Sequence, residues 1–285
     1  QVRQLTADLQ GRAAIPLFIA VDQEGGRVSR LKERYGFPDV PSQGFLGRLD
    51  DPDETTRVAA LTARTLAEAG ITMNFAPVVD VNVNPDNPII GKLERSFSAD
   101  PDVVIRHAAI MIQSFRQAGV ISALKHFPGH GSSRDDSHEG FVDVTDLWSE
   151  EELLLFAVLI EEGFADMVMT AHIFNERLDP ALPATLSRST VGGILRERLG
   201  FDGVVVSDDL QMGAIRDCYG FEEAIETALL AGVDILLFAN NSVYDEDVAE
   251  KAHGAIMTLL ERGIVDSGRI DRSWGRIMEL KSRLE

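Results

Sequence analysis

The residues best suited to chemistry lie in one short segment, which begins where a strand-like apolar run ends at Leu124. Lys125 and His126 follow this run directly, and a loop that contains proline and glycine comes next. Titratable residues on a loop that a rigid strand holds are commonly functional. Within the loop Asp136 precedes His138 by two positions, so the carboxylate could orient and charge the imidazole for general acid/base catalysis. A local hydrogen bond in a turn would explain this pair about equally well.

A second candidate is a pair of adjacent carboxylates, Asp208 and Asp209, which follows the very apolar run of residues 203–207. Side chains of successive strand residues point in opposite directions. One carboxylate could therefore enter a cavity, where it would suit nucleophilic or electrostatic catalysis. The other would then cap the following helix. From these residues alone, helix capping is the simpler interpretation for both.

A third group of charged residues follows another strand-like run. It contains Asp22 and Glu24, a pair of glycines that lets the backbone turn sharply, and then Arg27 and Arg30. Carboxylates and guanidinium groups in this arrangement could bind one small polar ligand. For Glu24 and Arg27, however, a salt-bridged turn is the simpler interpretation. Arg95 lies in a long loop of weak periodicity, and by itself it would be interpreted as a solvated arginine.

The composition argues against several classes of protein. A net charge of −19 argues against nucleic-acid binding, which relies on clustered lysine and arginine. The single cysteine, Cys218, excludes an internal disulfide and a multi-cysteine zinc site. His126, His130 and His138 could supply metal ligands, but their spacing matches no metal-binding motif, and we expect neither a metal nor a cofactor. No apolar run approaches the roughly 20 residues of a membrane-spanning helix, and no signal peptide is visible, so we expect a cytoplasmic protein.

Strand-like apolar runs and helical segments alternate along the chain. The runs are continuously apolar, which is typical of strands buried on both faces of a parallel sheet. We expect strands at residues 16–21, 73–79, 120–124, 167–171, 203–207 and 234–239, and helices at residues 53–68, 101–118, 149–162, 190–199, 221–231, 247–262 and 270–285. Glycine follows most of these helices and supplies the left-handed conformation that ends a helix. Polar clusters follow most of the strands, as in the active sites of (β/α)8 barrels, although a doubly wound sheet predicts a similar bias.

The order of these motifs resembles that of the β-N-acetylglucosaminidases of glycoside hydrolase family 3. The resemblance rests on the segments Asp-Gln-Glu-Gly-Gly-Arg-Val-x-Arg, Phe-Ala-Pro-Val-x-Asp, Arg-Ser-Phe, Lys-His-Phe-Pro-Gly-His-Gly, Asp-Ser-His and Ser-Asp-Asp-Leu-x-Met. It implies that Asp208 is the nucleophile that forms a glycosyl-enzyme, that His138 is the general acid/base and that Asp136 is its dyad partner. Five further residues match positions that bind the sugar: Asp22, Arg30, Arg95, Lys125 and His126.

The resemblance implies a retaining exo-β-N-acetylglucosaminidase that releases terminal GlcNAc from muropeptide or chitin-type fragments. Retaining glycosidases usually use two carboxylates, and here an imidazole beside a carboxylate would take the second role. Family-3 β-glucosidases typically lack the Asp-x-His pair. A glycosidase of the same fold that acts on glucose and a non-catalytic sugar-binding barrel are the alternatives.

The resemblance also predicts one catalytic domain over residues 1–285, built as a (β/α)8 TIM barrel. Family barrels begin with two β/α units that precede the strand before Asp22, and this chain starts at the helix just before that strand. We therefore expect a TIM-barrel-like fold without its first two β/α units.

Overall fold

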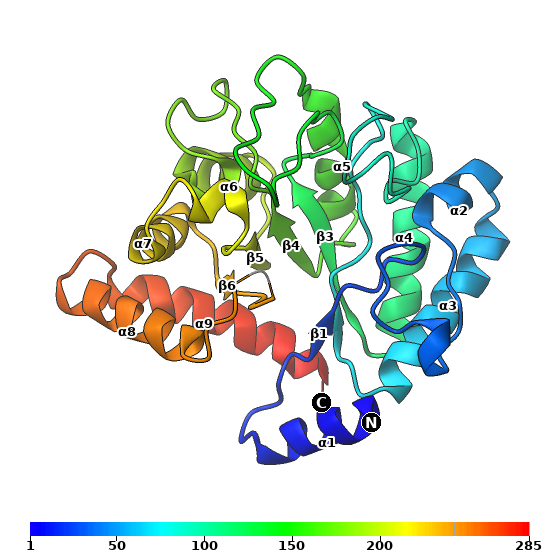
Figure 1. The fold of residues 1–285 in the computed structure, drawn as a ribbon, viewed down its shortest axis with the longest axis horizontal. Helices are drawn as coiled ribbons and strands as arrows, with labels where there is room; N and C mark the ends of the chain where they lie inside the picture. Colours follow the sequence, from blue (N-terminus) through cyan, green and yellow to red (C-terminus); the bar gives the residue numbers. More distant parts are fainter. Residues whose placement is uncertain (242, 285) are drawn as a thin grey trace.

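The structure, a computed structural model, describes residues 1–241 and 243–284, which fold around a sheet of six parallel strands (Figure 1). The strands are β1 (Ala20–Val21), β2 (Met73–Asn74), β3 (Ile121–Phe127), β4 (Met167–Thr170), β5 (Val204–Asp209) and β6 (Ile235–Leu237). Each lies at one of the six predicted runs, so the strand prediction is confirmed. The strands pair in sequential order from β1 to β6, whereas the order reverses in a doubly wound sheet. The sheet is therefore a curled half-barrel.

Helices connect the strands, and most of them, α9 excepted, pack outside the curled sheet (Figure 1). They are α1 (Val2–Arg12), α2 (Gln43–Leu49), α3 (Pro52–Glu68), α4 (Pro101–Gln117), α5 (Glu150–Glu161), α6 (Gly213–Arg216), α7 (Phe221–Ala231), α8 (Val248–Glu261) and α9 (Ser267–Lys281), with short 3-10 turns η1 (Glu33–Tyr35), η2 (Ala184–Leu186) and η4 (Ser282–Leu284). The glycines predicted to end six helical segments have φ angles between 67° and 116°, which confirms their role. The expected helix at residues 190–199 is instead a π-helix, η3 (Ser189–Arg198), in which the N–H of Leu199 donates to the carbonyl of Ile194.

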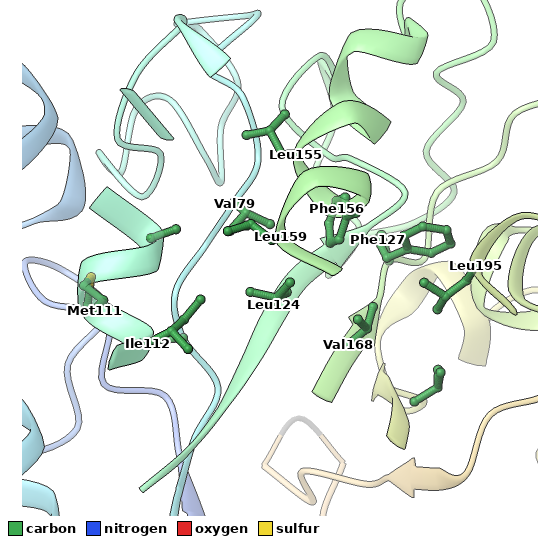
Figure 2. Close-up of a cluster of buried hydrophobic side chains, with 14 of the residues drawn as sticks. Val79, Met111, Ile112, Leu124, Phe127, Leu155, Phe156, Leu159, Val168 and Leu195 are labelled. Carbon is green, nitrogen blue, oxygen red and sulfur yellow. The ribbon is translucent and has the colours of Figure 1, made fainter. Parts of the chain in front are cut away.

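A large part of the core lies between the sheet and the helices α4 and α5 (Figure 2). Phe127 of β3, Val168 of β4 and Phe156 of α5 are fully buried there. The rings of Phe127 and Phe156 meet edge to face with 5.2 Å between their centroids, a favourable arrangement for aromatic pairs. This packing fixes the end of β3, which carries Lys125 and His126.

The last helix, α9, covers side chains on the opposite face of the sheet. Leu280 and Ile277 of α9 pack with a cluster of residues from β2 to β6. A buried carboxylate, Asp234, holds the helix in place, because Arg269 and Arg276 of α9 lie 3.5 and 3.4 Å from its Oδ1 atom. Among the helices of residues 1–241 and 243–284, none combines the length and the apolar character needed to cross a membrane.

Candidate active site

A cavity of about 370 Å³ opens where the carboxyl ends of the strands converge. All eight predicted site residues line it: Asp22, Arg30, Arg95, Lys125, His126, Asp136, His138 and Asp208. They lie on β3 and β5 or on the loops that follow β1, β2 and β3. Apolar side chains, among them Phe75 and Met169, complete the lining. The cavity therefore offers both hydrogen-bonding groups and apolar surface to one ligand.

Glu24 organises the charges behind this cavity. Its carboxylate accepts hydrogen bonds from Nε and Nη2 of Arg95, both at 2.8 Å, and lies 2.6 Å from Nζ of Lys125. Burial alone would raise the pKa of Glu24, but the charges of Arg95 and Lys125 outweigh it and hold the pKa far below its usual value. Two interpretations from the sequence are therefore wrong: Glu24 pairs with Arg95 and Lys125 instead of Arg27, and Arg95 is buried in an ion pair instead of solvated.

Asp22 is the carboxylate of this network that reaches the ligand space. Its Oδ1 atom accepts a hydrogen bond from Nζ of Lys125 at 2.8 Å, and its Oδ2 atom lies 3.7 Å from Nη2 of Arg30. Burial alone would lower the pKa of Lys125, but Asp22 and Glu24 together raise it. Lys125 is therefore charged and held in position before any ligand arrives.

Lys125 and His126 are neighbours in the sequence, yet both line the cavity. Side chains alternate between the two faces of a regular strand, but the pairing of β3 with β4 shifts register between Leu124 and Phe127. This irregularity allows two consecutive residues to serve one site.

Asp80, to which the sequence assigned no role, orients His126. Its Oδ2 atom lies 2.6 Å from Nδ1 of His126, and its Oδ1 atom accepts the N–H groups of His126 and His130 at 3.2 and 2.8 Å. A guanidinium group can only donate, so Nε2 of His126 accepts from Nη2 of Arg95 at 3.1 Å. Nδ1 of His126 must then carry the proton that it donates to Asp80. The position of Asp80 in the sequence could have indicated a role in the site, because Asp80 follows a predicted strand, as Asp22 does.

Asp208 lies at the end of β5 with its carboxylate at the cavity. Its Oδ1 atom accepts the N–H of Asp209 at 2.8 Å. Burial alone would raise the pKa of Asp208, but the neighbouring imidazoles of His172 and His126, the hydrogen bond from the N–H of Asp209 and the charge of Lys125 together outweigh it. The pKa is lowered as a result, so this carboxylate is ionised at neutral pH and available as a nucleophile.

Asp209 has a different task from the one the sequence predicts. The expected helix cap is wrong, because the next helix, α6, begins only at Gly213 and has Met212 as its N-cap. Instead, Oδ1 of Asp209 accepts the N–H groups of Gln211 and Ala239, each at 3.0 Å. Asp209 therefore ties the end of β5 to the segment that follows β6.

Asp136 and His138 form the predicted pair on the loop after β3. Nδ1 of His138 lies 2.8 Å from Oδ1 of Asp136, which also accepts the N–H of His138 at 2.8 Å. The imidazole side chain is 57% exposed and the carboxylate side chain 23% exposed. Because Nδ1 faces the carboxylate, Nε2 is the nitrogen that can meet a ligand.

His130 braces this loop from within. It is buried, and its Nδ1 and Nε2 atoms lie 2.8 and 3.2 Å from the hydroxyl oxygens of Ser133 and Ser137. Burial lowers the pKa of His130 to about 4, so it is neutral at physiological pH. His130 was considered only as a metal ligand from sequence; across the described residues, no group of three or more His, Cys, Asp or Glu side chains is placed to hold a metal ion.

Comparison with known proteins identifies the family. The family described as "Glycosyl hydrolase family 3 N terminal domain" matches residues 1–280. The chain is 37% identical to beta-hexosaminidase A of Pseudoalteromonas piscicida, covering 98% of this chain and 49% of that protein. It is 40% identical to a beta-hexosaminidase of Tolumonas auensis, covering 85% of this chain and 72% of that protein. The chain belongs to glycosyl hydrolase family 3.

A solved structure supports the same assignment. The glycoside hydrolase family 3 beta-N-acetylglucosaminidase from Paenibacillus sp. str. FPU-7 matches with a TM-score of 0.91 and 39% sequence identity, covering 99% of this chain and 54% of that chain. The present chain thus spans about half the length of this protein and of the Pseudoalteromonas relative.

Proposed function

We propose that this chain carries the catalytic site of a retaining exo-β-N-acetylglucosaminidase, which releases terminal β-linked GlcNAc from muropeptide or chitin-type fragments. The observation that carries the proposal is the convergence of Asp208 and the Asp136–His138 pair on one cavity with five residues suited to binding a sugar. Relatives named as beta-hexosaminidases and a beta-N-acetylglucosaminidase support the sugar class. The structural similarity to the Paenibacillus enzyme supports a fold that comprises six of the eight β/α units of a (β/α)8 barrel.

The reaction begins with Asp208. Its carboxylate attacks the anomeric carbon and forms a glycosyl ester as the bond to the leaving oxygen breaks. His138 gives the proton on Nε2 to that oxygen, while Asp136 stabilises the imidazolium from the other side. In the second step His138 takes a proton from water, the water oxygen bonds to the anomeric carbon, and Asp208 leaves as a free carboxylate. The sugar configuration is therefore retained.

The remaining charged residues bind the neutral sugar through its hydroxyl groups. Asp22 accepts hydrogen bonds, and the ammonium and guanidinium groups of Lys125 and Arg95 donate them. Such charge-assisted hydrogen bonds are stronger than neutral ones. Because Glu24 and Asp80 already fix these donors and His126, little ordering is required when the sugar binds.

Replacing Asp22 by alanine should lower kcat/KM for a GlcNAc glycoside by roughly 100-fold, because the sugar loses a charged acceptor and Lys125 loses one of its partners. Steady-state kinetics on an aryl GlcNAc glycoside measure this change. Asp39→Ala is the matched control, since Asp39 is exposed and does not line the cavity. An unchanged kcat/KM in Asp22→Ala would contradict the proposed sugar site.

The proposed function is tested by covalent trapping. A fluorinated GlcNAc glycoside with a good leaving group should label the peptide that contains Asp208, as detected by mass spectrometry, and Asp208→Ala should remain unlabelled. A comparison of kcat/KM on the p-nitrophenyl glycosides of GlcNAc and glucose shows which sugar the enzyme prefers. A higher kcat/KM for the glucoside would show a β-glucosidase, and binding without labelling or turnover would show a non-catalytic sugar-binding protein.

A further inference from the structure

A buried carboxylate outside the cavity holds the start of the loop that carries Asp136 and His138. Glu152 of α5 is only 1% exposed and does not line the cavity. Its Oε2 atom accepts the backbone N–H groups of Gly131 and Ser132 at 2.9 and 3.2 Å. The loop therefore leaves β3 attached to a side chain of the neighbouring helix.

The contact between α5 and this part of the chain is tight. A Cβ atom added at Gly129 would lie 2.5 Å from Cβ of Glu152 and 3.3 Å from Nε1 of Trp148. The indole N–H of Trp148 in turn donates to the carbonyl of Pro128 at 3.1 Å. Glu152 and Trp148 thus form one surface against which the loop begins, and a change at Glu152 is transmitted directly to the backbone.

In the described part of the chain, one oxygen of the Glu152 carboxyl group lacks a hydrogen-bond partner, which is compatible with both the ionised and the protonated form of the group. Its Oε1 atom is buried and has no hydrogen-bond partner among the described residues. Buried polar atoms without partners are costly. A proton on the carboxyl group would supply a donor where the ionised form has none.

The surroundings of Glu152 favour that proton. Burial raises the pKa of Glu152 to about 7, and the charge of Asp80 adds to the increase. The hydroxyl of Ser132 and the N–H groups of Ser132 and Gly131 act in the opposite direction. Asp80 itself accepts the backbone N–H of His130, so Asp80 and Glu152 hold adjacent residues at the start of the same loop.

We propose that Glu152 is a positioning residue for the proposed glycosidase reaction, and that binding of one proton to its carboxyl group changes how the loop presents His138 to the glycosidic oxygen. The proposal rests on the proposed function, because it assigns His138 the role of acid/base. Glu152 acts through the backbone of Gly131 and Ser132 without touching the substrate.

The first test does not depend on catalysis. Trp148 is buried beside Glu152, whereas the other tryptophan, Trp274, is 55% exposed, so a Trp274→Phe background isolates the fluorescence of Trp148. We expect this fluorescence to change with an apparent midpoint near pH 7, and Glu152→Gln to abolish the change. A transition that persists in Glu152→Gln, or no transition in either protein, would overturn the proposal.

The second test separates positioning from general stability. Glu152→Ala should lower kcat/KM for an unactivated GlcNAc disaccharide about ten-fold more than for an activated aryl glycoside, because only the disaccharide depends on a well-placed His138. Glu152→Gln keeps the acceptor and should restore most of this loss, while Glu151→Gln, an exposed neighbour on α5, should behave as wild type. Equal losses on both substrates would show a merely structural residue. An inactive wild-type enzyme would refute the proposed function, and the fluorescence test would still decide whether Glu152 titrates.

Discussion

Replacing Asp208 by alanine is expected to reduce kcat on the order of 10⁴-fold or more, because Asp208 supplies the carboxylate that forms the proposed glycosyl ester. The fold should persist, since the side chain faces the cavity and accepts a hydrogen bond from its neighbour Asp209. Turnover of an aryl GlcNAc glycoside measures the loss in kcat, and the melting temperature shows whether the fold persists. Azide or formate should restore part of the activity by replacing the missing carboxylate in the cavity.

Asp209→Ala is the matched control for this experiment. The change removes the acceptor for the N–H groups of Gln211 and Ala239, and a buried donor left without a partner, as the N–H of Gln211 would be, costs about 1–3 kcal/mol. We therefore expect a clear loss of stability with much of the turnover retained. If Asp209→Ala were inactive and Asp208→Ala active, the assignment of the nucleophile would be reversed.

Replacing His138 by alanine should affect substrates according to their leaving group. An unactivated disaccharide needs a proton on the glycosidic oxygen, so its kcat/KM should fall roughly 10²–10⁴-fold. An activated aryl glycoside leaves without protonation and should lose far less. The comparison requires one substrate of each kind, assayed with wild type and His138→Ala under the same conditions.

Asp136→Asn should show a milder form of the same pattern. Its amide keeps an oxygen near Nδ1 of His138 but no longer stabilises the positive charge that the imidazole carries as an acid. Equal losses on both substrate classes in His138→Ala would instead show that His138 binds the sugar or supports the loop.

The sequence predicted the strands well because each is a continuous apolar run that a parallel sheet buries on both faces. It did not predict α2 (Gln43–Leu49), in which Gly44 and Gly47 lower the intrinsic helix propensity. The structure explains these glycines by close packing, since a Cβ atom at Gly47 would lie 1.8 Å from the carbonyl oxygen of Phe97. Such tertiary contacts leave no pattern in the local sequence from which the helix could be predicted.

The site was predictable where a side chain faces the cavity and less so where it supports another residue. Asp22 and Asp208 follow strands and carry motifs that resemble a known family, and both line the cavity. Glu24, Asp80 and Glu152 act through buried partners far away in the sequence, such as Arg95 for Glu24. A pairing of that kind depends on strand order and register, which one sequence does not specify.

Glu24 and Asp22 together balance the charges of Arg95 and Lys125, and this balance also affects which substrates reach the cavity easily. These two cations therefore add no local positive charge that would attract an anion to a molecule whose net charge is −19. A neutral chitin-type oligosaccharide approaches such a molecule freely, whereas a muropeptide with carboxylate groups is repelled at long range. Dissolved salt screens this repulsion beyond about 10 Å at 0.1 M, so ionic strength governs the encounter rate of anionic substrates and leaves that of neutral ones unchanged.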